Sequence, residues 1–303
     1  MTHSNKEYNH TMRIDALQAF VAVAELGSFQ AAGQRLHLSQ PAVSKRLAAL
    51  ETRLGHRLFD RVGRGVGLTE AGRAYLPHAR ETLAALADGD RALDNLADRV
   101  EGTLALAISH HVGLHRMPEV LRAFVARYPH VTPEIEFADS EAACQRVVNG
   151  EAELAVITLP VAAHPTLLAR TIWHDPLAIY AGIEHPLARR ESVTFADLSD
   201  YAAVLPPRDS YTYHIIDRAL AAEGTTLQTR MTSHYLETLR MLADIGLGWT
   251  VLPRAMPHAL VPLALPSLDM HRELGVMRHP QRNPSNAARA LLAMLEAAAA
   301  SPD

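Results

Sequence analysis

The N-terminal part of the chain has the hydrophobic spacing of short amphipathic helices. An apolar stripe at i, i+3, i+4 and i+7 begins at Leu17 and predicts a helix that starts near Asp15 and stops at Gly27. Ser28 and Ser39 can each cap a further helix, because a serine hydroxyl accepts a hydrogen bond from a backbone N–H of the first turn. The pattern therefore predicts three helices, with a tight turn between the second and the third.

The third predicted helix has two unlike faces. At about 100° per residue its apolar stripe consists of Val43, Leu47, Leu50 and Leu54, and the opposite face carries Pro41, Ser44, Lys45, Ala48 and Thr52. A slim polar face allows a helix to enter the major groove of DNA, whereas an ordinary amphipathic surface helix has no need of it. Arg46 and Arg53 flank this face, where guanidinium groups reach phosphates. This pattern favours a DNA-recognition helix.

A glycine-rich segment follows the third helix. Gly63, Gly65 and Gly67 alternate with other residues and predict a two-stranded hairpin, or wing, with Arg61 and Arg64 at its tip. Basic side chains on a wing contact the DNA backbone or minor groove and fix position rather than sequence.

A long helix is predicted next, from a cap at Thr69 to about Val100. Its heptad seam consists of Leu76, Ala79, Leu83, Leu86, Asp90, Leu93, Ala97 and Val100. Such a seam favours pairing with the same helix of a second copy, and packing within one chain is the alternative. Glu101 and Gly102 are predicted to form a hinge.

From Thr103 onward apolar runs alternate with amphipathic segments. The predicted strands are 104–108, 134–137, 154–158, 169–173, 177–181, 202–205, 228–231, 249–252 and 273–277, and the predicted helices are 113–128, 141–148, 213–222, 235–243 and 286–299. Uniformly apolar strands separated by helices are typical of a parallel sheet covered on both faces. The fold class predicted here is therefore α/β, in two lobes.

Charge separates the two parts of the chain. The net charge is −4 over 303 residues, but Met12 to Val66 carries eight basic and four acidic side chains, so the rest of the chain is strongly acidic. A basic module on an acidic body is expected where only one domain meets phosphates. No apolar run of about 18 residues predicts a membrane span, no secretory signal is present, and the single Cys144 suits a reducing cytoplasm.

Catalytic and metal motifs have little support in the sequence. The chain has no G-x-S-x-G, H-E-x-x-H or G-x-x-x-x-G-K-[ST] motif, so we predict no enzyme, no catalytic residue and no cofactor. Seventeen histidines raise the question of a metal, and His111 and His115 stand at i, i+4. Because no cysteine or carboxylate lies at a diagnostic offset from them, no metal ligand is predicted.

Motifs in two parts of the chain resemble those of a known protein family. Met12 to about Arg80 contains SQPAVS, ALE-x-x-LG-x-x-LF-x-R and LT-x-AG, and resembles the winged helix-turn-helix of LysR-type transcriptional regulators. LHRMPEVLRAFVARYPHV, NGEAELAVIT and DIGLGWTVLP resemble the periplasmic-binding-protein-like effector domain of the same family. The resemblance implies a DNA-binding domain at 12–68, a linker helix and hinge at 69–102, and an effector domain at 103–303. Lobe I would comprise 103–174 and 274–303, and lobe II 175–273.

The resemblance also implies partners. These are double-stranded promoter DNA, a small-molecule co-inducer, RNA polymerase and further copies of the chain, as a homodimer through the linker helix and a homotetramer. The DNA-binding candidates are Ser28, Ser39, Gln40, Pro41, Ser44, Lys45, Arg46, Arg53, Arg61 and Arg64. The family more often has arginine where Lys45 stands, and lysine weakens bidentate readout of guanine.

An effector site is expected where strands end and helices begin, because such positions present free backbone N–H groups. The candidates are Ser109, His110, His111, Asp139, Ser140, Thr158, Arg208, Ser210, Tyr211 and Ser233. Hydroxyl, guanidinium and N–H donors favour a small anion, although each of these residues is also an ordinary capping type.

Two other functions are the alternatives to a cytoplasmic regulator. The α/β body alone suits a solute-binding protein, but the N-terminal module and the lack of a signal peptide oppose that function. An enzyme is opposed by the missing catalytic constellation. DNA binding that weakens steeply with salt would favour the regulator over both.

Overall fold

The computed structural model describes residues 14–62, 65–97, 99–256, 259–265 and 268–299. The chain divides into two units, Met1–Asp90 and Arg91–Asp303. Within the described residues no helix has the length and apolar character needed to cross a membrane.

The first unit begins with three helices and a wing. The helices are α1 (Ile14–Leu26), α2 (Phe29–Arg35) and α3 (Gln40–Leu54), and the wing strands β1 (Phe59–Val62) and β2 (Gly65–Leu68) pair antiparallel. Ser28 and Ser39 cap α2 and α3 as predicted, each accepting a hydrogen bond from a first-turn N–H. Gly33 lets α2 approach the turn closely, because a Cβ atom there would lie 2.7 Å from the carbonyl oxygen of Leu38.

The long helix α4 (Glu70–Asp94) differs from the prediction in two ways. It ends at Asp94 and continues only as a 3-10 turn (Asn95–Ala97), not as a helix to Val100. The reason is tertiary, since the Asn95 side chain bonds to the backbone of Asn286 and Pro284. The early seam residues Leu76, Ala79 and Leu83 pack into the core of the first unit, whereas Leu86 and Leu93 are 44% and 68% exposed. The seam is therefore divided between intramolecular packing and an open apolar face.

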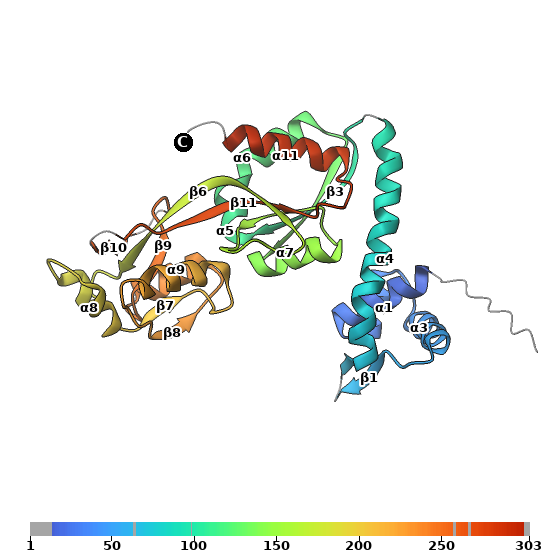
Figure 1. Ribbon diagram of the computed structural model, residues 1–303, viewed down its shortest axis with the longest axis horizontal. Helices are drawn as coiled ribbons and strands as arrows, with labels where there is room; N and C mark the ends of the chain where they lie inside the picture. Colours follow the sequence, from blue (N-terminus) through green and yellow to red (C-terminus); the bar gives the residue numbers. More distant parts are fainter. Residues whose placement is uncertain (1–13, 63–64, 98, 257–258, 266–267, 300–303) are drawn as a thin grey trace, which may run out of the picture. The chain divides into compact units, whose positions relative to one another are not determined.

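Lobe I of the second unit is a sheet with helices on both faces (Figure 1). Its strands β3 (Gly102–Ser109), β4 (Val131–Ala138) and β5 (Leu154–Thr158) are parallel, and β11 (His271–Arg278) joins β5 antiparallel. Helices α6 (Met117–Arg127) and α11 (Asn286–Ala299) pack on one face, and α7 (Ser140–Asn149) packs on the other. This arrangement confirms the predicted α/β class.

The helix predicted over 113–128 is two helices, α5 (His110–His115) and α6, which meet at Arg116. Pro118 in the first turn of α6 explains the break, because its ring clashes with the carbonyl of a preceding helical turn and it has no N–H to donate. The break points α5 along a different direction from α6.

The first crossing from lobe I to lobe II is made by one strand, not by two. The strands predicted at 169–173 and 177–181 are the two halves of β6 (Leu168–Ala181). Its first half pairs with β11, and its second half pairs with β9 (Thr250–Pro253) and β10 (Val261–Pro262). Pro176 stands where β6 changes partners, a position at which a missing N–H is tolerated. In Figure 1, β6 and β11 lie side by side through this crossing.

Lobe II is smaller. Its strands β7 (Ala203–Leu205) and β8 (Thr229–Thr232) are parallel, and an isolated bridge from Ala203 to Trp249 links them to β9. Helices α8 (Phe195–Ser199) and α9 (Tyr211–Ala221) pack on one side with a 3-10 turn (Pro186–Arg189), and α10 (Leu236–Asp244) packs on the other. Trp249 is fully buried, and its indole N–H donates to the carbonyls of Leu198 and Tyr201.

A buried ion pair lies at the lobe crossing. Asp175 of β6 and Arg272 of β11 are 1% and 2% exposed, and Arg272 Nε lies 3.1 Å from Asp175 Oδ2. Arg116 approaches the other carboxylate oxygen at 3.7 Å. One carboxylate therefore lies between two guanidinium groups where both chain crossings occur.

We expect Asp175→Asn to lower the free energy of unfolding of the second unit by about 3–5 kcal/mol, because it leaves the Arg272 charge buried without its counter-ion. Chemical denaturation followed by tryptophan fluorescence measures this change. The exposed Asp209 provides the matched control, since Asp209→Asn removes a carboxylate of equal size at the surface. Equal stability of the two variants would contradict the role given to the ion pair.

Candidate functional site

The outer face of α3 consists of Gln40, Pro41, Ser44 and Lys45, all of which are exposed; we term it the DNA-reading face. The inner face holds Val43, Leu47 and Leu50 in the core. Short side chains at the start of a capped helix leave room for base edges to approach the backbone. The four residues singled out for base contacts therefore share one accessible surface.

Several predicted phosphate contacts have partners within the protein. Arg46 Nε lies 3.4 Å from Asp15 Oδ2, and Arg53 Nη2 donates to Tyr75 Oη at 3.3 Å. Arg61 belongs to β1, and Arg64 lies outside the described residues. The ion pair with Asp15 holds Arg46 against α1, so a phosphate would have to compete for it.

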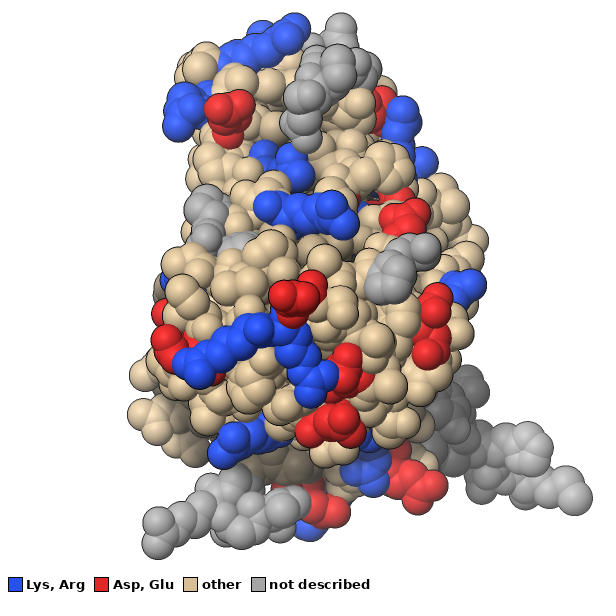
Figure 2. All heavy atoms as spheres, turned by 90° about the vertical axis from the view of Figure 1, so that its left-hand side faces the viewer, with Lys and Arg blue, Asp and Glu red and all other residues tan. Residues whose placement is uncertain are grey.

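The surface of the second unit is of mixed charge where it carries lobe II. Figure 2 shows basic and acidic side chains interspersed over this face, with broad neutral areas between them. A nucleic-acid-binding surface concentrates one sign of charge. The described part of this face therefore lacks the single-sign field seen at DNA-binding surfaces.

A cleft between the two lobes brings together residues from several elements of each lobe. It encloses about 50 Å³ and is lined by Ser109, His110, His111, Ala138, Asp139, Ser140, Glu141, Thr158, Pro206, Ser210, Thr212, His234, Leu236 and Arg272. We term this the inter-lobe cleft. Seven of the ten effector candidates are in its lining, because the strands of each lobe end there and the next helices begin there.

The other three candidates lie elsewhere. Arg208 is exposed and outside the lining, and Ser233 uses its hydroxyl to accept the N–H of Tyr235. Tyr211 lies just beyond the lining, and its backbone N–H donates to Glu141. Sequence reasoning missed Arg272, Glu141 and Thr212. Arg272 stands between His271 and Glu273 at the start of β11, and this polar stretch gave no sign that its side chain would line a cleft.

The hydroxyl of Ser109 stands out among the polar groups of the cleft. It is buried at the end of β3, and no hydrogen-bond partner lies within reach among the described residues. Leaving a buried hydroxyl unpaired costs free energy, so such groups mark positions where a ligand or water completes the bonding. Arg272 adds a cation to the same wall, with Nη1 at 3.5 Å from Thr212 Oγ1.

Glu141 links the lobes across the cleft. It belongs to α7 of lobe I, and its carboxylate accepts the N–H of Tyr211 in the first turn of α9. Burial raises the pKa of Glu141 above its ordinary value, against the opposing effect of this hydrogen bond. A carboxylate of the protein itself therefore occupies the N-terminus of α9 beside the cleft.

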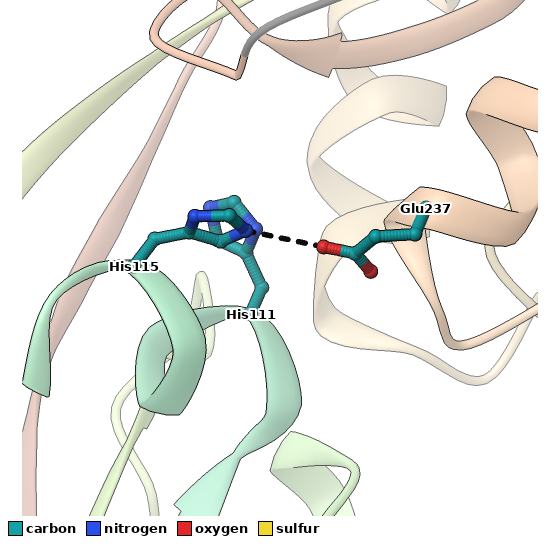
Figure 3. Close-up of side chains that lie close together, drawn as sticks. All are labelled: His111, His115 and Glu237. Carbon is teal, nitrogen blue, oxygen red and sulfur yellow. Dashed lines mark hydrogen bonds and ion pairs between the residues drawn. The ribbon is translucent and has the colours of Figure 1, made fainter. Parts of the chain in front are cut away.

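Histidines make further contacts between the lobes. The His110 ring lies 4.6 Å from the Tyr235 ring, edge to face, and stacks on Phe137 at 5.8 Å. His115 Nε2 lies 3.1 Å from Glu237 Oε1, and the His111 and His115 rings are 4.6 Å apart (Figure 3). Glu237 is the carboxylate partner that no offset in the sequence revealed, because it comes from α10 of the other lobe.

Two family models match this chain. Residues 14–73 match the bacterial regulatory helix-turn-helix protein model of the lysR family, and residues 97–300 match the LysR substrate binding domain. Together these models span almost all described residues.

Individual relatives are similar over most of the chain or over a part of it. A probable RuBisCO transcriptional regulator of Cyanidioschyzon merolae is 30% identical over 286 residues, covering 91% of this chain and 94% of that protein. An uncharacterized HTH-type transcriptional regulator of Azotobacter vinelandii is 64% identical over 107 residues, covering 35% of this chain and 74% of that protein.

Solved structures show the same fold at lower identity. A full-length OxyR variant of Pseudomonas aeruginosa has a TM-score of 0.66 at 21% identity, covering 94% of this chain and 98% of that one. CbnR in complex with its target DNA has a TM-score of 0.62 at 23% identity, covering 95% and 99%.

We expect Glu141→Gln to change how stability depends on pH. The folded-state pKa of Glu141 is raised, so its contribution is complete below the ordinary value of 4.5 and is lost as pH rises through the folded pKa. The variant keeps an amide oxygen that can accept the Tyr211 N–H. Because the amide does not titrate, its contribution to stability does not fall as pH rises. The free energy of unfolding of the two proteins should therefore change differently with pH. The difference in slope is a fraction of about 1.4 kcal/mol per pH unit, the value for one full proton, because the carboxyl is still partly exposed to solvent.

Urea denaturation of both proteins between pH 4 and pH 8 measures the effect. Glu223→Gln is the control, because Glu223 is exposed. If stability changes with pH in the same way in the wild type and in Glu141→Gln, the pKa of Glu141 is not raised in the folded protein.

Proposed function

The chain belongs to the LysR family of DNA-binding transcriptional regulators, and we propose that α3 reads promoter DNA while a small anion in the inter-lobe cleft controls how the DNA is held. The observation that carries the first half is the DNA-reading face, whose residues are exposed together on a capped helix. Gln40 and Ser44 offer hydrogen bonds to base edges, and Lys45 adds a positive charge. A cytoplasmic location follows from this target.

The open part of α4 supports assembly of two copies. Leu86 and Leu93 lie seven positions apart and are largely exposed, and Leu96 in the following 3-10 turn is 80% exposed. A helix with apolar residues at heptad spacing buries them against a second helix of the same kind. We propose a homodimer through this segment, with two dimers on an extended site as the larger assembly.

The chemistry of the cleft supports a small anionic effector. Ser109 offers an unsatisfied buried hydroxyl, and Arg272 lies in the wall with its charge partly balanced by Asp175. Asp139 and Glu141 also line the cleft, so a highly charged anion is disfavoured and a small monocarboxylate fits better. A cavity of about 50 Å³ admits only a small group unless the lobes move apart.

Control of DNA binding requires that the effector prefers one arrangement of the lobes. The cleft lining comes from both lobes, so a ligand that contacts Ser109 and Ser210 together binds the closed arrangement more tightly than an open one. A ligand that bound both arrangements equally well would leave their relative populations unchanged. The proposed signal is therefore a change in lobe closure that alters the placement of two α3 helices on bent DNA.

For DNA binding we expect Lys45→Ala to weaken the affinity for a selected duplex about tenfold, because a base contact worth about 1–3 kcal/mol is lost. The slope of log Kd against log salt should also become shallower, because one positive charge next to the DNA is removed. The duplex is selected by the wild-type protein from a random pool, and fluorescence anisotropy measures Kd. Arg122→Ala is the control, since Arg122 is an exposed basic residue of α6 in the second unit. If the wild-type protein selects no duplex, the proposed function is wrong.

For the effector we expect one member of a panel of small carboxylates and inorganic anions to raise the Tm of the full-length protein. Ser109→Ala should weaken that ligand by about 1–3 kcal/mol, because a hydroxyl that pairs with it is lost. Arg208→Ala should leave the affinity unchanged, since Arg208 is outside the lining. Isothermal titration calorimetry measures the affinity of the ligand for the wild type and for each of the two variants. A ligand that binds all three equally does not use this cleft wall.

A further inference from the structure

Three side chains from two lobes converge beside the inter-lobe cleft. His111 and His115 lie one helical turn apart on α5 of lobe I, and Glu237 lies in the first turn of α10 of lobe II. One ligand atom from each of the three lies within 4.8 Å of the other two. Figure 3 shows both imidazole rings side by side and directed toward the carboxylate. Two imidazoles and a carboxylate form a donor set that binds zinc and related ions.

Histidine binds a metal ion as the neutral imidazole, and glutamate binds it as the carboxylate. The three side chains can therefore supply two nitrogen donors and one oxygen donor to a single ion.

His111 has no other evident use for its ring. Its Nδ1 atom is buried, and no hydrogen-bond partner lies within reach among the described residues. An ion pair between His115 and Glu237 would be complete without a second imidazole 4.6 Å from the first. The additional ring is explained if both imidazoles share one ligand.

The surrounding charges permit a cation. Arg272 and Arg116 lie near His111 and oppose a positive ion, and His115 would do so if protonated. Asp175 pairs with both guanidinium groups, and Glu237 faces the imidazoles directly. The two carboxylates balance the two arginines, so a divalent ion enters a region without net positive charge.

We propose that His111, His115 and Glu237 form a binding site for a divalent transition-metal ion of the zinc class, which joins lobe I to lobe II. Metal–nitrogen and metal–oxygen bonds of about 2.0–2.2 Å require ligand atoms about 3–3.5 Å apart, so the present cluster needs only small side-chain rotations. Water completes the coordination. The site does not depend on the identity of the effector.

Metal binding at this position would be coupled to the effector. His111 lines the inter-lobe cleft and is also a metal ligand, so both ligands act on the same wall and on the same lobe closure. Coupling between two sites is reciprocal, and each ligand then raises or lowers the affinity for the other by the same factor. The regulator would respond to the availability of a metal ion as well as to a small anion.

Zinc titration of the full-length, chelator-treated protein tests the proposal. Calorimetry should show one saturable equivalent of Zn²⁺, and Mg²⁺ should not replace it, because Mg²⁺ prefers oxygen ligands. His115→Ala and Glu237→Gln should each weaken this equivalent at least about tenfold. His130→Ala removes an exposed histidine and should leave the equivalent intact. The shift in Tm on adding zinc is compared within each variant, because losing the ion pair alone lowers the Tm of the metal-free protein.

Hydrogen exchange reports whether the ion joins the lobes. Zinc should slow amide exchange in α5 and in α10 together in the wild type, and should not do so in Glu237→Gln. Absence of a saturable equivalent, or affinity unchanged in His115→Ala, overturns the proposal. Affinity lost in His115→Ala but retained in Glu237→Gln also overturns it, since the ion would then bind one lobe alone. None of these outcomes depends on whether DNA is bound.

Discussion

The buried pair of Asp175 and Arg272 is the interaction on which the second unit depends. It stands where β6 and β11 pass from one lobe to the other, and Arg272 also forms part of the cleft wall. A guanidinium group in so buried a position is tolerable only with a carboxylate beside it. The same carboxylate thus holds the crossing together and allows a positive charge to line the inter-lobe cleft.

Much of the fold followed from local signals. The caps Ser28 and Ser39, the apolar periodicity of α3 and the apolar run in β3 each act within a few residues, and the structure confirms them. The errors arose where distant contacts decide. Asn95 ends α4 early because it bonds to the start of α11, which is almost two hundred residues away in the chain. Two strands were predicted on either side of Pro176, yet β6 passes through this residue and exchanges partners there.

Only some residues of the candidate site could be predicted from local sequence signals. Ser109, Asp139 and Ser140 were predictable, because strand ends and helix starts are visible in the sequence and share one edge of the sheet. Arg272 and Glu237 were not, since β11 returns from lobe II and α10 approaches α5 across the cleft. His111 and His115 showed helical spacing in the sequence, but 122 positions separate His115 from its carboxylate partner. A site whose residues come from two lobes cannot be identified from any one short stretch of the sequence.

The unbroken course of β6 has a mechanical consequence. Both connections between the lobes are adjacent strands of one ladder, so the lobes cannot slide apart without breaking backbone hydrogen bonds. A twist of this two-stranded ribbon about its own axis keeps those hydrogen bonds. The ladder therefore restricts relative movement of the two lobes mainly to torsion.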